Sequence, residues 1–319
     1  MGIYDNFMTF LQKRAKYIVL IGVISGSFSG NFARITVAPP MVIGFFRLVF
    51  ALPILLIPVL RKSEKRGELK KAFTDIKFLV PISIAAGGLY GHYMCIFKAV
   101  KMTTMASAAT LMSLHPLIVI FISYVFFKRR VGFKAVLGIV VALTGVAIIA
   151  GMDYSFESVG AGGVTGDILA FSSGVLLAFY FIFGKFVRDK GISADVYIVA
   201  CFGICVVLFA ITIFITDTKA FSYAPKDYMY IFGMAMLCQV FAHTVFNWAF
   251  AYLSDVYVSA WQTMEGVFTI IIAFFMFGEI PATTQIIGGI ITFGGLIYFN
   301  FHNHVDSGEI KVPVTGKQG

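Results

Sequence analysis

The chain contains ten stretches of about 20 predominantly apolar residues, and this pattern is the strongest constraint on its fold. A helix needs roughly 20 apolar residues to cross the hydrocarbon core of a bilayer. The stretches are continuous rather than alternating, which argues against a transmembrane β-barrel. We therefore expect an all-α integral membrane protein with ten transmembrane helices. They cover residues 17–36, 41–60, 78–99, 104–127, 133–151, 166–187, 195–216, 227–249, 256–277 and 283–301.

The composition agrees with this expectation. The 319 residues are 59% hydrophobic and only 13% charged, whereas soluble domains carry about 25% charged residues. The 31 Gly and 35 Phe residues fit helices that pack through small residues and meet lipid with large ones. The first stretch lacks a cleavage site followed by a polar sequence, so we expect a retained helix rather than a signal peptide.

The Lys and Arg residues predict how the helices are oriented. With the N-terminus in the cytoplasm, 19 of the 25 fall in cytoplasmic segments. This bias predicts that both termini lie on the cytoplasmic side of the inner (cytoplasmic) membrane. It also explains most of the net charge of +9, so we expect no nucleic-acid partner. The largest basic cluster, residues 61–77, is either a topological determinant or a contact for anionic lipid.

An internal repeat is visible in the sequence. Residues 97–150 and 247–300 align at a constant offset of 150, so that Gly138 corresponds to Gly288 and Gly145 to Gly295. In each half the two glycines lie on one helix face and predict close helix packing. Each half has five stretches, an odd number, so the second half enters the membrane in the opposite direction. Such inverted repeats recur in secondary transporters, with the binding site near the membrane midplane.

This pattern divides the chain into five parts. We expect a cytoplasmic N-terminal segment, a first five-helix repeat, a Gly-rich extracytoplasmic linker, a second five-helix repeat and a cytoplasmic C-terminal tail. The linker has no Lys-Ser or Lys-Thr after its glycines, so it is not a phosphate-binding loop. The parts cover residues 1–16, 17–152, 153–165, 166–301 and 302–319.

Several short motifs add a family resemblance. They are Ser27-Phe28-Ser29-Gly30-Asn31-Phe32, Phe46-Arg47-Leu48-Val49-Phe50-Ala51, Phe97-Lys98-Ala99-Val100, Ser113-Leu114-His115-Pro116-Leu117 and Phe277-Gly278-Glu279. In their order and spacing, over about residues 17–301, they resemble the EamA type of the drug/metabolite transporter superfamily. The resemblance implies ten helices in two repeats, cytoplasmic termini and transport of small metabolites or drugs, often outward. Where that family often has a glutamate before the fifth helix this chain has Arg129, and the second-half equivalent is Glu279; we expect both to be interfacial.

Ionisable and polar residues at membrane depth are costly and mark a pathway or a site by default. Glu265 is the only acid deep in a stretch, and Trp261 and Gln262 precede it by about one turn. His115 corresponds to Glu265 at the repeat offset. Gln239, His243 and Asn247 are four residues apart and predict one polar stripe. The candidate substrate-binding residues are Glu265, Trp261, Gln262, His243, Asn247, Gln239, His115, Tyr90, His92, Tyr93, Tyr180, Asn31 and Arg47.

Each of these residues also has a structural interpretation. The stripe either lines a cavity or joins helices by hydrogen bonds. His115 either belongs to the site or binds a carbonyl freed by Pro116. Arg47 snorkels or pairs with a carbonyl, or else attracts anionic groups. Glu265 binds a cationic substrate, takes up a proton in each cycle, or only bonds a neighbouring helix.

The sequence therefore predicts a gradient-driven secondary transporter for a small polar or cationic metabolite, an amine or an amino acid. Its partners would be this small-molecule substrate and the lipid bilayer; the oligomeric state is not predicted. Soluble-enzyme motifs are absent, and we expect no enzymatic activity, no cofactor and no metal. The four cysteines lie in apolar stretches without metal-ligand spacing, so free thiols are expected. A membrane-embedded metal enzyme and a passive channel are the alternatives.

Overall fold

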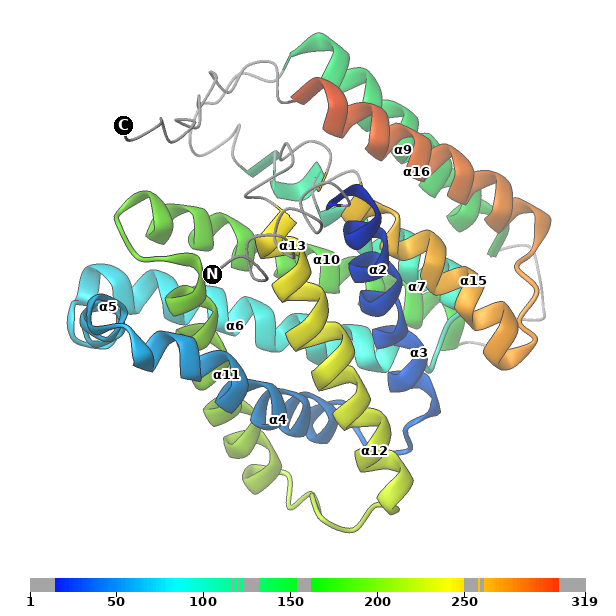
Figure 1. The fold of residues 1–319 in the computed structure, drawn as a ribbon. Coiled ribbons are helices and arrows are strands. Elements are labelled where there is room, and N and C mark those ends of the chain that lie inside the picture. Colours follow the sequence, from blue (N-terminus) through cyan, green and yellow to red (C-terminus); the bar gives the residue numbers. More distant parts are fainter. Residues whose placement is uncertain are drawn as a thin grey trace, which may run out of the picture.

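The computed structural model describes residues 15–115, 117–119, 121, 122, 132–153, 162–249, 258 and 261–303, and its regular elements there are helices (Figure 1). The first half contains α2 (Ala15–Gly26), α3 (Phe28–Ile35), α4 (Pro40–Arg61), α5 (Ser63–Thr74), α6 (Ile76–Ala99), α7 (Met105–Met112) and α9 (Phe133–Asp153). The second half contains α10 (Gly162–Asp189), α11 (Ala194–Ile215), α12 (Pro225–Gly233), the π-helix η1 (Met234–Phe241), α13 (Ala242–Ala249), α15 (Glu265–Phe277) and α16 (Thr283–Asn303).

The apolar helices lie where the hydropathy pattern predicts them. Six helical stretches within the described residues are long and apolar enough to cross a membrane: 17–35, 40–61, 76–99, 163–189, 194–215 and 225–246. Four shorter apolar helices cover 105–119, 136–148, 261–277 and 283–299. The expectation of a helical, multi-pass membrane protein is therefore confirmed.

Two boundaries differ from those expected. Helix α10 begins at Gly162, so the end of the expected linker 153–165 is already helical; residues 154–161 lie outside the described part of the chain. The basic segment 61–77 was expected only as a connection, yet most of it forms α5. Its Lys, Glu and Leu residues favour a helix, but it lacks the long apolar run by which the other helices were found.

The glycines of the repeat pack where helices α9 and α16 lie side by side (Figure 1). A Cβ atom on Gly138 would lie 2.8 Å from Cα of Phe299, and one on Gly295 would lie 2.8 Å from O of Gly138. A Cβ on Gly145 would collide with O of Gly288. The backbones thus approach more closely than any larger residue permits, which confirms the predicted glycine packing.

Contacts between the halves are reciprocal. Helix α10, the first of the second half, packs on α6, the third long helix of the first. In return α2, the first helix of the first half, packs on α13 in the third stretch of the second half. Helix α4 packs on its counterpart α11, α7 on α15, and α9 on α16. Thr292 donates to O of Ala142 at 3.3 Å, and these residues are 150 apart, which is the offset of the repeat.

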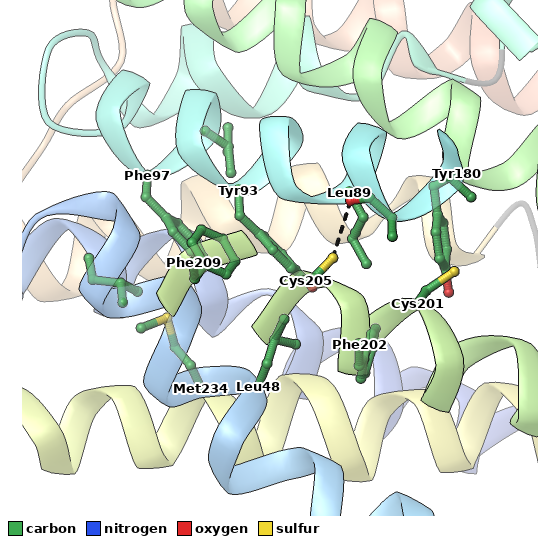
Figure 2. Close-up of a cluster of buried hydrophobic side chains, with 14 of the residues drawn as sticks. Leu48, Leu89, Tyr93, Phe97, Tyr180, Cys201, Phe202, Cys205, Phe209 and Met234 are labelled. Carbon is green, nitrogen blue, oxygen red and sulfur yellow. Dashed lines mark hydrogen bonds between the residues drawn. The ribbon is translucent and has the colours of Figure 1, made fainter. Parts of the chain in front are cut away.

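The main apolar core lies between α4, α6 and α11 (Figure 2). Leu48 of α4, Leu89 of α6 and Phe202 of α11 are almost completely buried there. Cys201 and Cys205 lie on the face of α11 toward α6, and the thiol of Cys205 donates to O of Ala86 at 3.2 Å. All four cysteines are free thiols, as predicted.

Polar contacts join loops between helices that the distribution of Lys and Arg assigns to the same side of the membrane. At one end, Lys101 donates to O of Thr36 and O of Ala38, at 2.6 and 2.7 Å. Asp227 accepts from N of Val37 there, at 2.9 Å. At the other end, α5 contacts the start of α11. The connections expected outside and those expected inside are therefore grouped at different ends of the helices.

Candidate functional site

Arg47 lies inside the protein rather than at its surface. It is seven residues into α4, and only 6% of it is exposed. Its Nε donates to Oε1 of Gln239 at 3.1 Å, and a terminal nitrogen donates to Oγ of Ser29 at 2.6 Å. The guanidinium also lies over the rings of Tyr93 and Phe97, 5.1 and 5.8 Å from their centroids. Its side chain does not snorkel, and its hydrogen-bond acceptors in the described structure are neutral side chains.

The π-helix η1 brings Gln239 to this arginine. Gln239 is 1% exposed, and its Oε1 also accepts from the hydroxyl of Tyr93 at 3.1 Å. Segments of π-helix are rare in proteins, and those that occur are often found at functional sites. The wider turn changes the angular spacing of side chains, so the regular spacing assumed for the predicted polar stripe does not hold through η1. The side chains of the other two stripe residues, His243 and Asn247, lie outside the described part of the structure.

Glu265 begins helix α15 beside the break in the first stretch, where α2 ends and α3 begins. Its backbone O accepts from Oγ of Ser27 at 3.0 Å and from Oγ1 of Thr269 at 2.8 Å. Its carboxyl group lies directly against Gly26, because a Cβ atom on that glycine would be 2.8 Å from Cδ of Glu265. A glycine at position 26 therefore leaves the space that the carboxyl group occupies.

Arg47 and Glu265 are both ionisable groups within the apolar stretches of the sequence. They are not an ion pair, however, since the ion pairs among the described residues join other groups. Arg47 donates to Ser29, and Ser27, two residues earlier, donates to the backbone O of Glu265, so both residues lie beside the start of α3.

Asn31 adds a buried polar group to the same region. It is fully buried, and its Nδ2 donates to O of Ser27 and O of Thr269, both at 3.2 Å. Its Oδ1 is buried without a hydrogen-bond partner. Asn31 therefore joins α3 to α15 close to Glu265 and still has one acceptor available.

The remaining candidates make contacts that explain them structurally. Nδ1 of His92 lies 3.0 Å from O of Ser173, and the hydroxyl of Tyr90 lies 2.7 Å from Oγ1 of Thr212. Tyr180 packs on the ring of Tyr197. Nδ1 of His115 lies 3.3 Å from O of Met112, as expected if the histidine binds a carbonyl before the proline.

Trp261 lies against an apolar cluster that contains Val19 and Val23 of α2. Gln262 is half-buried next to it. The structure therefore brings together Arg47, Gln239, Tyr93, Asn31 and Glu265, and we call these five residues the central polar cluster.

Three contributors to this cluster were not among the predicted site residues. Ser29 accepts from Arg47, Phe97 provides a ring beneath it, and Thr269 bonds the backbone at Glu265. Ser29 and Phe97 stand in motifs that carry the family resemblance. Hydroxyl and phenyl groups are common in membrane helices, so only the three-dimensional contacts distinguish these three from the others.

A second charged pair closes one end of the protein. Gly278 has a φ of 64°, a left-handed conformation that favours glycine and ends α15. The next residue, Glu279, forms an ion pair with Arg34 and accepts from N of Met105 at 2.8 Å. The motif Phe277-Gly278-Glu279 therefore joins the end of α15 to the ends of α3 and α7, in keeping with the interfacial position expected for Glu279.

Comparisons with known proteins agree with this arrangement. The model of the EamA-like transporter family matches the chain twice, at residues 14–151 and 164–301. An uncharacterized transporter of Archaeoglobus fulgidus is 25% identical over 83% of this chain and 89% of its own length. The uncharacterized transporter YyaM of Bacillus subtilis is 24% identical over 93% of this chain and 95% of its own length.

The fold is also present among solved structures. A protein crystal structure superposes with a TM-score of 0.64, at 15% identity, over 92% of this chain and 99% of its own. The family model matches one segment in each half of the chain, and the two matches together cover most of the sequence. The chain belongs to the EamA-like transporter family, within the drug/metabolite transporter superfamily.

Proposed function

We propose that this protein is a secondary transporter that moves a small polar or cationic metabolite, an amine or an amino acid across the cytoplasmic membrane. The observation that carries the proposal is the central polar cluster, in which Arg47 is buried with only neutral hydrogen-bond partners among the described residues and forms no ion pair with Glu265. A charged side chain at the centre of a membrane helix costs about 2.5–3.5 kcal/mol on insertion scales. Two ionisable side chains at this depth that do not form an ion pair with each other indicate a role in binding a ligand.

The chemistry of the cluster supports a substrate with a cationic group. The Glu265 carboxylate would pair with an ammonium group, whereas the Tyr93 ring already holds a cation, the guanidinium of Arg47. The guanidinium of Arg47 presents several donors in one plane and suits a carboxylate. An amino acid, which carries both groups, would use both ends of the cluster.

The repeat supports alternating access as the mechanism. The reciprocal contacts between the halves are those expected around a pseudo-two-fold axis, where residue i contacts j and the counterpart of j contacts the counterpart of i. We propose ten membrane spans in two inverted five-helix repeats with both termini in the cytoplasm. In inverted-repeat transporters one part rocks against the other around a fixed midplane site.

Counterflow in proteoliposomes tests this function. Vesicles preloaded with unlabelled candidate substrates, chosen by thermal-shift screening of amines and amino acids, should accumulate the labelled compound transiently and saturably. Arg47→Gln should abolish this signal, while Lys219→Gln, which removes an exposed charge outside the helices, should leave it unchanged. Flux that is linear in concentration would indicate a channel, and chemical conversion of the compound would indicate an enzyme.

A pH gradient across the same vesicles tests the energy source. We propose that Glu265 couples transport to protons, either by competing with the substrate or by exchange. Accumulation driven by the gradient, abolished by a protonophore, is the expected result. Counterflow without any response to a pH or ion gradient would show that the protein is an exchanger and would contradict gradient-driven transport.

A further inference from the structure

Helix α5 is fixed to the protein by one of its faces. Lys65 forms an ion pair with Asp195 at the start of α11. Glu68 accepts from N and Oγ of Ser193, at 2.7 and 2.6 Å. Ala72, one turn further on, is completely buried. These contacts hold α5 against the connection between α10 and α11, and Figure 1 shows α5 running across the direction of α4 and α6.

The opposite face of α5 is basic and exposed. Lys62, Arg66 and Lys70 follow one another at intervals of four residues, and all three are exposed. A spacing of four residues is slightly more than one helical turn, so the three basic side chains form a stripe along the helix. Phe73, 44% exposed, extends this face with an apolar side chain. Glu64 is the one exposed acid in α5 among these cations.

The connectivity places this face at the membrane surface. Helices α4 and α6 are both long and apolar enough to span a bilayer. Helix α4 ends at Arg61 and α6 begins at Ile76, so α5 joins the same end of both. A helix in that position lies at the level of the lipid headgroups, where basic residues meet anionic phosphodiesters.

We propose that the basic face of α5, formed by Lys62, Arg66 and Lys70, binds the headgroups of anionic phospholipids, and that this binding stabilises the folded transporter. The occupant is the lipid surface, since a stripe of cations beside an exposed phenyl ring matches phosphate groups above acyl chains. The inner face of α5 holds Ser193 and Asp195, where α11 begins. Helix α11 in turn packs on α4, the helix that carries Arg47. Lipid bound to the outer face of α5 therefore stabilises the helix contacts, from α5 through α11 to α4, that hold Arg47 in the central polar cluster.

The test uses the full-length protein in nanodiscs of neutral phosphatidylcholine or of anionic phosphatidylglycerol. We expect the wild-type Tm to be several degrees higher in the anionic discs, because a ligand that binds the folded state stabilises it. The triple variant K62Q/R66Q/K70Q should lose at least half of that rise. The matched control K98Q/K219Q/K226Q removes three exposed lysines, at the far end of α6, after the far end of α11 and at the start of α12, and it should keep the rise.

The outcomes separate this proposal from the alternatives. An unchanged rise in the triple variant, or an equal loss in the control, would contradict it. If the triple variant does not fold, the single variants R66Q and K70Q are measured instead, and each should lose part of the rise. Glycerol 1-phosphate added to neutral discs should have no effect; an equal stabilisation would show a soluble-phosphate site instead of a lipid surface. Since the readout is Tm, it is independent of any transported substrate.

Discussion

Arg47 is the residue whose surroundings depart furthest from what a membrane helix normally tolerates. Its donors are shared between Gln239 and Ser29, and its flat guanidinium lies over two aromatic rings. Lysine has the same charge but a single compact ammonium group, so it cannot make these contacts at once. The position therefore depends on the shape of arginine as well as on its charge.

Arg47→Lys should reduce the rate of transport at least tenfold while the protein remains folded. A tenfold change corresponds to about 1.4 kcal/mol, close to the value of one hydrogen bond to a charged group. Counterflow together with a melting curve in detergent measures both effects. Lys219→Gln, which removes an exposed charge outside the helices, is the control and should transport at the wild-type rate. Normal transport by the lysine variant would mean that the guanidinium geometry has no role.

Glu265→Gln should abolish net transport and leave the protein folded. Glutamine keeps the shape of the side chain against Gly26 and removes its charge. If the carboxylate pairs with the substrate, affinity should fall more than tenfold, or about 1.4 kcal/mol. If it only carries a proton, substrate exchange should survive while the response to a pH gradient disappears. Uptake and pH dependence identical to those of the wild-type protein would show that Glu265 is purely structural.

At the scale of elements, the α9–α16 pair is the most closely packed interface that the repeat predicts. Gly145 of α9 faces Gly288 of α16, and Gly295 faces Gly138. The two contacts are related by exchange of the repeats, so each half supplies the same glycines to its partner. Neighbouring glycines of α16 do not share this constraint: a Cβ on Gly289 or Gly294 would meet nothing within 4 Å.

This difference between neighbouring glycines leads to a matched experiment. Gly145→Ala and Gly295→Ala should each destabilise the protein by about 1–3 kcal/mol, the usual cost of overpacking. Gly289→Ala and Gly294→Ala should be neutral or stabilising, since alanine favours a helix over glycine by about 1 kcal/mol. Thermal melts in one detergent give the comparison. Equal Tm values for all four variants would contradict close packing at this interface. Leucine is larger than alanine, so Gly138→Leu and Gly288→Leu should also lower the expression of the protein.

At the scale of the whole molecule, the topology connects the repeat to the transport mechanism. Single cysteines in a variant without the four native ones should react with a membrane-impermeant maleimide according to side. Position 160 should be labelled from outside, and positions 65 and 310 only after the membrane is opened. Positions 160 and 310 lie outside the described residues. Labelling of 65 and 160 from the same side would contradict ten spans and inverted repeats.

Much of the fold was predictable because the bilayer acts as a simple solvent. The apolar stretches identified α4, α6, α9, α10, α11 and α16 within a few residues, and the offset of 150 identified the glycines that meet between α9 and α16. Helix α5 was missed because its residues are mostly charged or polar, so no apolar stretch marks it. The π-helix η1 was also missed, since a change of one hydrogen-bond register leaves no mark in composition.

The sequence by itself determined that this chain is a multi-pass helical membrane protein with a repeated glycine pattern. Both properties follow from local rules: helix length matches bilayer thickness, and close backbones require glycine. Only the tertiary structure decided which polar residues form one cluster. It brought Arg47, Gln239 and Glu265 together from three distant stretches and gave His92 and Tyr90 other partners. Hydrogen bonds act over a few ångströms in space, whereas Arg47 and Glu265 are separated by more than two hundred positions along the chain.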